Sequence, residues 1–138
     1  MNRPIPLARP NITQAEIDAV VAVLRTPNLS LGPKVPEFES AFARYCGTKH
    51  AVACINGTAG LRLLVRAMGI GPGDEVITTP FSFVASANCV LMEGAKPVFV
   101  DIDPHTWSID PPRVAEAVSE KTKAIIPVDV FGQPADTD

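Results

Sequence analysis

The sequence predicts an α/β fold in which a mostly parallel sheet is covered by helices on both faces. From Ala51 onward, short apolar strands alternate with helices, and each strand is a continuous apolar run, as in strands that are buried on both faces. Such alternation favours parallel strands joined by right-handed crossovers. The predicted strands are 52–55, 75–79, 97–101 and 124–128, and the predicted helices between them are 58–68, 82–93 and 111–120.

Residues 1–50 are predicted to form an N-terminal arm and two helices, ahead of an α/β region at 51–138. The arm is rich in proline and leads to a capping box, in which Glu16 follows Thr13 by three positions. This pattern predicts the start of an amphipathic helix. Two prolines and a glycine then make 26–33 a loop.

The second helix is predicted to begin near Pro33 and to end at Gly47. Its apolar residues keep to one stripe, which includes Phe38 and Phe42. We expect both phenylalanine rings to be buried against the sheet or against a neighbouring helix.

Composition excludes several classes of partner. The net charge is −3, the isoelectric point is near 5.3, and no run of basic residues is present, which argues against nucleic acid. No segment is long and apolar enough to span a bilayer. Cys46, Cys54 and Cys89 have no CxxC spacing, and the last two fall in apolar patterns where we expect small core residues. A cytoplasmic protein with a small-molecule partner fits these observations best.

The junction at Asn56, Gly57 and Thr58 is the first candidate site. A predicted strand runs there directly into a helix, and a helix N-terminus presents unpaired backbone N–H groups and the positive end of the helix dipole. Both favour an anion such as a phosphate. Asn56 and Thr58 could equally do no more than cap the helix, so both interpretations stay open on these residues alone.

Polar or aromatic residues also follow the other predicted strands. In an open parallel sheet, ligands bind outside the carboxyl ends of the strands. A phosphate site, an aromatic ring and carboxylates together suit a planar, phosphorylated ligand with a cationic ring. The phenylalanines could instead be core residues and the aspartates turn or cap formers. The residues concerned are Phe81 and Phe83 after the second strand, Asp101 and Asp103 after the third, and Asp129 after the fourth.

These junctions, in this order, resemble the PLP-dependent sugar aminotransferases of the DegT/DnrJ/EryC1/StrS family. The resemblance covers essentially the whole chain. It implies a fold-type-I transferase that uses pyridoxal 5'-phosphate (PLP) and moves an amino group, usually from glutamate, to a nucleotide-linked keto-sugar for polysaccharide or secondary-metabolite biosynthesis. The matching segments are Arg9-Pro10, Ser30-Leu31-Gly32-Pro33 before Phe38-Glu39, Asn56-Gly57-Thr58-Ala59, Thr79-Pro80 with Phe83-Val84-Ala85-Ser86-Ala87-Asn88, Val100-Asp101-Ile102-Asp103, and Gly132-Gln133-Pro134-Ala135-Asp136.

The resemblance also implies roles for particular residues in cofactor binding. The phosphate contact falls on the backbone of Gly57, Thr58 and Ala59, and the aromatic side chain that stacks on the pyridine ring falls on Phe83. We therefore expect the N–H groups of Thr58 and Ala59 to be free of partners within the helix. These N–H groups should point into an open cleft, and Phe83 should lie on the rim of that same cleft with one ring face uncovered.

The loop at 28–33 is implied to take part in substrate binding and dimer formation. Ser30, Leu31 and Gly32 are the substrate-binding residues by resemblance, and family members are dimers whose sites use residues from both subunits. A surface that meets a partner often exposes apolar side chains. We therefore expect Leu29 and Leu31 to be partly exposed.

Two departures from the family pattern stand out. Asp129 occupies the place where the family usually has a histidine, so any role of that imidazole is in doubt. The carboxylate that pairs with the pyridine nitrogen and the Schiff-base lysine are both expected beyond Asp138, so these residues alone are not expected to catalyse. A catalytic lysine must lose water to lower its pKa. The lysines within the chain, none of which is expected to be desolvated, are Lys34, Lys49, Lys96, Lys121 and Lys123.

Several alternatives remain open. One is a PLP-dependent sugar dehydratase of the same family, another is a truncated and non-catalytic fragment, and a third is a nucleotide-binding Rossmann module, although no G-x-G-x-x-G follows a strand. In the fold that the resemblance implies, the strand at 52–55 does not pair with the strand at 75–79. We therefore expect the backbone of 52–55 to be unpaired.

Overall fold

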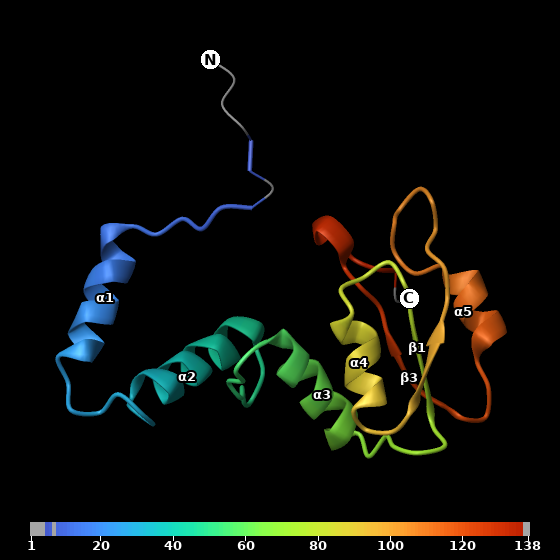
Figure 1. Ribbon diagram of the computed structural model, residues 1–138, viewed down its shortest axis with the longest axis horizontal. Coiled ribbons are helices and arrows are strands. Elements are labelled where there is room, and N and C mark those ends of the chain that lie inside the picture. Colours follow the sequence, from blue (N-terminus) through green and yellow to red (C-terminus); the bar gives the residue numbers. More distant parts are fainter. Residues whose placement is uncertain (1–4, 7, 137–138) are drawn as a thin grey trace. The chain divides into compact units, whose positions relative to one another are not determined.

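The computed structural model describes residues 5–6 and 8–136, which fall into two compact units that meet between Ala53 and Cys54. The first unit contains α1 (Gln14–Leu24) and α2 (Lys34–Cys46). The second contains the sheet and the helices around it (Figure 1). Its elements are α3 (Gly57–Ala67), β1 (Glu75–Thr78), α4 (Ala85–Leu91), β2 (Lys96–Phe99), α5 (Pro111–Ala117), β3 (Thr122–Ile126) and the 3₁₀ turn η1 (Val130–Gly132).

Local sequence signals set the ends of both helices in the first unit. The Thr13 hydroxyl accepts a hydrogen bond from the Ala15 N–H at 3.3 Å, and the Glu16 carboxylate accepts one from the Thr13 N–H at 2.6 Å, so the predicted capping box is confirmed. Gly47 ends α2 in the left-handed conformation with a φ of 66°.

The expected burial of Phe38 and Phe42 is wrong. Their rings contact each other with centroids 5.7 Å apart, yet each side chain remains at least half exposed. Ala43 is the only residue of α2 that is buried. An amphipathic stripe is buried only where another element covers it, and the two helices of this unit do not cover this stripe.

The three strands of the second unit form a parallel sheet in the order β2-β1-β3. Helices cover both faces, which confirms the predicted α/β class. On one face, Val65 of α3 and Val90 of α4 pack with Val76 of β1. On the other face, Val114 of α5 packs against a cluster that contains Ile77. The consecutive residues Val76 and Ile77 of β1 therefore point to opposite faces of the sheet and supply the two halves of the core.

The segment 52–55 does not form the predicted strand. It pairs with no strand in the part of the chain that the structure describes, and Val52 and Ile55 are 80% and 91% exposed. The prediction that it does not neighbour β1 is confirmed, because β1 pairs with β2 and β3. An apolar segment forms a β-strand only where a neighbouring strand pairs with its backbone hydrogen-bonding groups. Cys54 is also exposed, against prediction, whereas Cys89 is buried as predicted.

Residues 5–6 and 8–136 contain no helix with the length and apolar character that a membrane crossing requires.

Candidate functional site

The order of the strands places a crevice at the carboxyl ends of β1 and β3. After β1 the chain adds β2 on one side of it and then β3 on the other side. The order in which the strands are added therefore reverses between β1 and β3. Such a switch point is where open α/β sheets bind ligands. A hollow of about 360 Å³ lies there, formed by the segments that follow the two strands. Its lining residues are Pro80, Phe81, Ser82, Phe83, Val128, Val130 and Phe131.

Side-chain hydroxyls shape the loop between β1 and α4. The buried Thr78 hydroxyl donates to the Ile126 carbonyl oxygen at 3.0 Å and joins β1 to β3 below the hollow. The Thr79 hydroxyl accepts from the Phe81 N–H at 3.1 Å, and the hydroxyls of Ser82 and Ser86 lie 2.7 Å apart. The loop therefore makes a tight turn at the mouth of the crevice.

Phe83 projects from this loop and is 74% exposed. It lines the hollow, whose lining residues do not include 56–59, so its predicted place on the rim of the phosphate cleft stays a prediction. An exposed aromatic ring beside a hollow can stack on a planar ligand and adds about 0.5–1.5 kcal/mol beyond the burial of area. Its role in binding the pyridine ring stays a prediction.

The N-terminus of α3 retains two backbone donors. The Asn56 side chain accepts from the Ala59 N–H at 2.9 Å, and the Asn56 carbonyl oxygen accepts from the Gly60 N–H at 3.1 Å. Within the part of the chain that the structure describes, the N–H groups of Gly57 and Thr58 make no hydrogen bond. The capping interpretation is confirmed, and it leaves two donors that an anion could use.

The expectation that the Ala59 N–H is free is wrong, because the Asn56 cap occupies it. A cofactor phosphate would fit the remaining donors. A Cβ built on Gly57 meets no atom within 4 Å, so the space beside this backbone is open. A phosphate contact of Gly57, Thr58 or Ala59 remains a prediction.

The aspartates that follow the strands bind their own backbone. The Asp103 carboxylate accepts from the N–H groups of His105 at 2.8 Å and Thr106 at 2.9 Å, which confirms the turn-forming interpretation. The Thr106 and His105 backbone donors lower the pKa of Asp103. Asp101 accepts from the Ile102 N–H, and Asp129 accepts from the Ala135 N–H at 3.0 Å. These carboxylates act locally as turn formers.

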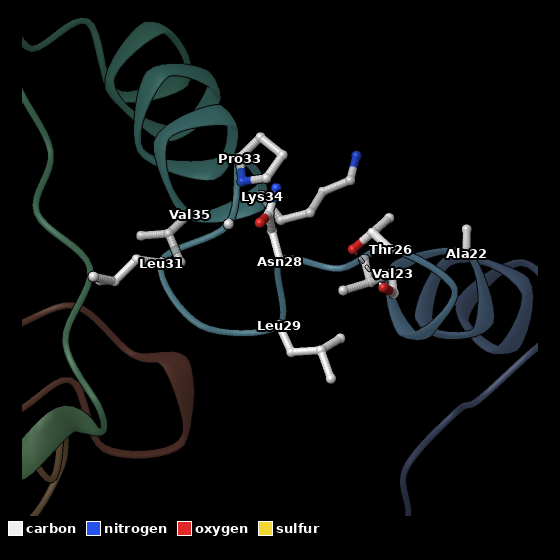
Figure 2. A pocket seen from close by; sticks show the side chains of 10 residues that line it. Ala22, Val23, Thr26, Asn28, Leu29, Leu31, Pro33, Lys34 and Val35 are labelled. Carbon is white, nitrogen blue, oxygen red and sulfur yellow. Dashed lines mark hydrogen bonds between the residues drawn. The ribbon is translucent and has the colours of Figure 1, made fainter.

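The loop at 28–33 lies in the other unit and is described by itself. Leu29 is more than half exposed and Leu31 is fully exposed, as predicted, and Figure 2 shows their side chains leaving the loop in different directions. A hollow of about 250 Å³ lies beside them. Leu31 has a left-handed φ of 53°, and Gly32 is required because a Cβ there would lie 2.6 Å from the Asn28 carbonyl oxygen. Substrate binding by Ser30, Leu31 and Gly32 stays a prediction.

All of the lysines are exposed, as predicted. Lys34 pairs with Glu37 at 2.6 Å, and Lys96 pairs with Glu75 at 2.9 Å. None of the lysines lines the hollow at the switch point. The described residues therefore place no amine in that crevice.

The sequence pattern missed Trp107 as a residue of interest and named Phe131 only as part of a strand end. Both residues have left-handed backbones, and their rings contact each other and Phe81. The sequence offered a local signal for each residue. Trp107 is an aromatic residue at the end of the Asp103 turn, and Phe131 is an aromatic residue directly before Gly132.

Known proteins resemble this chain in sequence. Residues 10–138 match the model of the DegT/DnrJ/EryC1/StrS aminotransferase family. The spore coat polysaccharide biosynthesis protein SpsC of Bacillus subtilis is 48% identical over 99% of this chain and 35% of its own length. The UDP-2-acetamido-2-deoxy-3-oxo-D-glucuronate aminotransferase of Pseudomonas aeruginosa is 49% identical over 89% of this chain and 34% of its own length.

Solved structures agree with this result. Spr1654 of Streptococcus pneumoniae in its PLP form gives a TM-score of 0.91 at 41% identity, covering 96% of this chain and 34% of that one. The aminotransferase from Psychrobacter cryohalolentis gives 0.87 at 42% identity, covering 94% and 33%. This chain thus spans about a third of the length of the proteins that it matches. The match over residues 10–138 shows that the chain belongs to the DegT/DnrJ/EryC1/StrS aminotransferase family.

Proposed function

We propose that this chain forms the first part of a PLP-dependent aminotransferase that moves an amino group from glutamate to a nucleotide-linked keto-sugar. The names of the relatives support a substrate of this class, since one is a UDP-keto-sugar aminotransferase and another is a GDP-perosamine synthase. The observation that carries the proposal is the N-terminus of α3, where two adjacent N–H groups are free beside open space.

Particular residues would hold the cofactor. The N–H groups of Gly57 and Thr58 would donate to the phosphate, with the helix dipole adding to the attraction. Phe83 would cover one face of the pyridine ring and keep water from it. When bound, the cofactor supplies the electron sink for amino transfer. We also propose that Ala59 contributes to the shape of the phosphate site. Residues 51–138 would form the first half of the cofactor-binding domain.

The other unit would contribute to the substrate site. We propose that Ser30, Leu31 and Gly32 contact the sugar nucleotide and that two copies of the protein pair through this region. The exposed Leu29 and Leu31 support a partner surface. A cytoplasmic location is supported by Cys46, Cys54 and Cys89, which are all free thiols.

Replacing Gly57 by proline tests the phosphate site. Proline removes the N–H group but is favoured at the first position of a helix, and the extended backbone of Asn56 (φ −165°, ψ 172°) suits a residue before proline. We expect Gly57→Pro to keep the helix content by circular dichroism. Its affinity for PLP and for inorganic phosphate, measured by calorimetry, should fall about tenfold, as expected for the loss of one charge-assisted hydrogen bond.

Gly57→Ala is the matched control. It keeps the N–H group, and its Cβ meets no atom within 4 Å. We expect its affinity for inorganic phosphate to stay within about twofold of the parent chain, since the donor is unchanged. Equal phosphate binding by the proline and alanine variants would overturn the proposed site.

A further inference from the structure

Three aromatic side chains meet at the carboxyl edge of the sheet. Phe81 follows β1, Trp107 follows β2 and Phe131 follows β3, so each comes from a different loop. The ring centroids of Phe81 and Trp107 lie 5.5 Å apart, those of Trp107 and Phe131 6.3 Å, and those of Phe81 and Phe131 6.4 Å. All three pairs have the edge-to-face geometry that aromatic rings prefer. We call these residues the aromatic triad.

Two members of the triad have an unfavourable backbone. Trp107 has a φ of 64° and Phe131 a φ of 56°, in the left-handed region that bulky residues rarely adopt. Strain of this kind persists only where the surrounding contacts over-determine it. Phe131 is 88% exposed, so burial of its ring is not what holds it. The interactions present at these positions are the ring contacts of the triad and local backbone hydrogen bonds, among them that from the Trp107 N–H to the Asp103 carbonyl oxygen at 2.8 Å.

Phe81 of the triad lies two residues before Phe83 in the same loop. The N–H of Phe81 donates to the Thr79 hydroxyl at 3.1 Å, the N–H of Ser82 donates to the Pro80 carbonyl oxygen at 3.0 Å, and the N–H of Ser86 donates to the Phe83 carbonyl oxygen at 3.1 Å. Phe81 and Phe83 therefore share one tight turn. Only the backbone of this turn, through Ser82, links Phe81 to Phe83.

We propose that Trp107 and Phe131 are positioning residues, whose edge-to-face contacts hold the Phe81 ring and, through the turn that Phe81 and Phe83 share, orient the Phe83 ring at the hollow. This proposal rests on the proposed function in one respect, that Phe83 stacks on the cofactor ring. Trp107 does not line the hollow and would act only through Phe81. The simpler interpretation is that the three rings pack together without any effect on Phe83, and the experiment separates the two.

The first measurement needs no cofactor. Trp107→Leu removes an aromatic ring from the triad, and Trp107→Phe keeps one. We expect amide hydrogen exchange at Ser82 and Ser86, on either side of Phe83, to become about two- to twelvefold faster in Trp107→Leu, the range for loss of the one aromatic pair of Trp107 that reaches this loop, its pair with Phe81. Trp107→Phe should restore slow exchange. Unchanged exchange in Trp107→Leu would overturn the proposal.

A second variant guards against a folding defect. Phe131→Leu alters an exposed ring, and Trp107 is the only tryptophan of the chain, so its fluorescence reports on the triad. We expect its emission to shift to the red and the same two amides to exchange faster in Phe131→Leu, with Phe131→Tyr like the parent. Phe42→Leu, which breaks the aromatic pair of α2, is the control and should change neither.

The third measurement separates the positioning role from the proposed function. In Trp107→Leu, the dissociation constant for PLP should rise about two- to twelvefold, whereas that for inorganic phosphate should not change, because phosphate meets only the α3 donors. Loss of affinity for both ligands, or for neither, would overturn the positioning role. If the parent chain binds neither ligand, the proposed phosphate site of α3 fails, and amide exchange alone then decides whether the triad orders the Phe83 loop.

Discussion

Two single residues, Asp103 and Gly32, determine the conformation of the loops in which they lie. The Asp103 carboxylate begins a turn by accepting from two N–H groups that follow it, and its carbonyl oxygen accepts from the Trp107 N–H at 2.8 Å. Gly32 fits where no larger residue can, since a Cβ would lie 2.6 Å from a backbone oxygen of Asn28. One residue shapes the triad and the other shapes the loop proposed to meet substrate.

The Asp103 turn predicts a pH dependence of Trp107 fluorescence. The Thr106 and His105 backbone donors lower the pKa of Asp103 from its ordinary value of 3.8. A lowered pKa means that the stabilisation is present above the ordinary value and is lost as the pH falls through the lowered one. We expect Trp107 emission to be constant from neutral pH to about pH 4 and to shift only below it. Asp103→Asn keeps an acceptor oxygen, so this titration step should be absent from its emission.

Gly32→Ala predicts a local defect. The Cβ cannot be accommodated without moving the backbone of Asn28, so we expect a loss of about 1–3 kcal/mol in the unfolding free energy of the first unit, measured by denaturant titration followed by circular dichroism. Gly57→Ala, whose Cβ meets no atom within 4 Å, is the control. Equal stability of the two variants would show that the loop at 28–33 has a different conformation in solution.

At the scale of elements, one hydroxyl links the two strands at the crevice. Thr78 is fully buried in β1 and donates to the Ile126 carbonyl oxygen of β3 at 3.0 Å. The apolar neighbours of Thr78 in β1 pack into the two halves of the core. The position therefore combines burial with a bond that holds the switch point together.

Thr78→Val tests how much the hydrogen bond between Thr78 and Ile126 contributes to stability. Valine has nearly the same shape but leaves the Ile126 carbonyl without this donor, so we expect the unfolding free energy to fall by about 1–3 kcal/mol in urea titrations. Thr122→Val is not a suitable control, because its hydroxyl accepts from the Ser119 N–H. Thr48→Val, which removes an exposed hydroxyl bond to the His50 carbonyl oxygen, serves instead and should cost less than about 1 kcal/mol.

At the scale of the whole molecule, several apolar side chains are exposed in the first unit, as the proposed dimer requires. Leu29 and Leu31 are exposed in the first unit, and the apolar stripe of α2 with Phe38 and Phe42 is only half covered. Monomeric proteins rarely leave large apolar patches in contact with water. Together with the proposed dimer, this exposure suggests that the first unit is completed by a partner.

Light scattering tests the proposed dimer. We expect the parent protein to show a mass above that of a monomer at micromolar concentration. The double change Leu29→Ser with Leu31→Ser should raise the dissociation constant of the dimer at least about tenfold, because the dimer would no longer bury two leucine side chains that are exposed in the monomer. Val118→Ser, which alters an exposed apolar residue beyond α5, is the control. A stable monomer at all concentrations would contradict the dimer.

The sequence by itself determined the alternation of strands and helices and the capping box at Thr13, because these depend on patterns of neighbouring residues, whereas it left Asp103 open between a ligand-binding carboxylate and a turn former. Only the tertiary structure decided which apolar runs are buried. The run at 52–55 looks like a strand but has no neighbour, and Phe42 looks like a core residue but has no cover. It also decided that Phe81, Trp107 and Phe131 meet, because contacts between residues distant in the chain depend on the order of the strands.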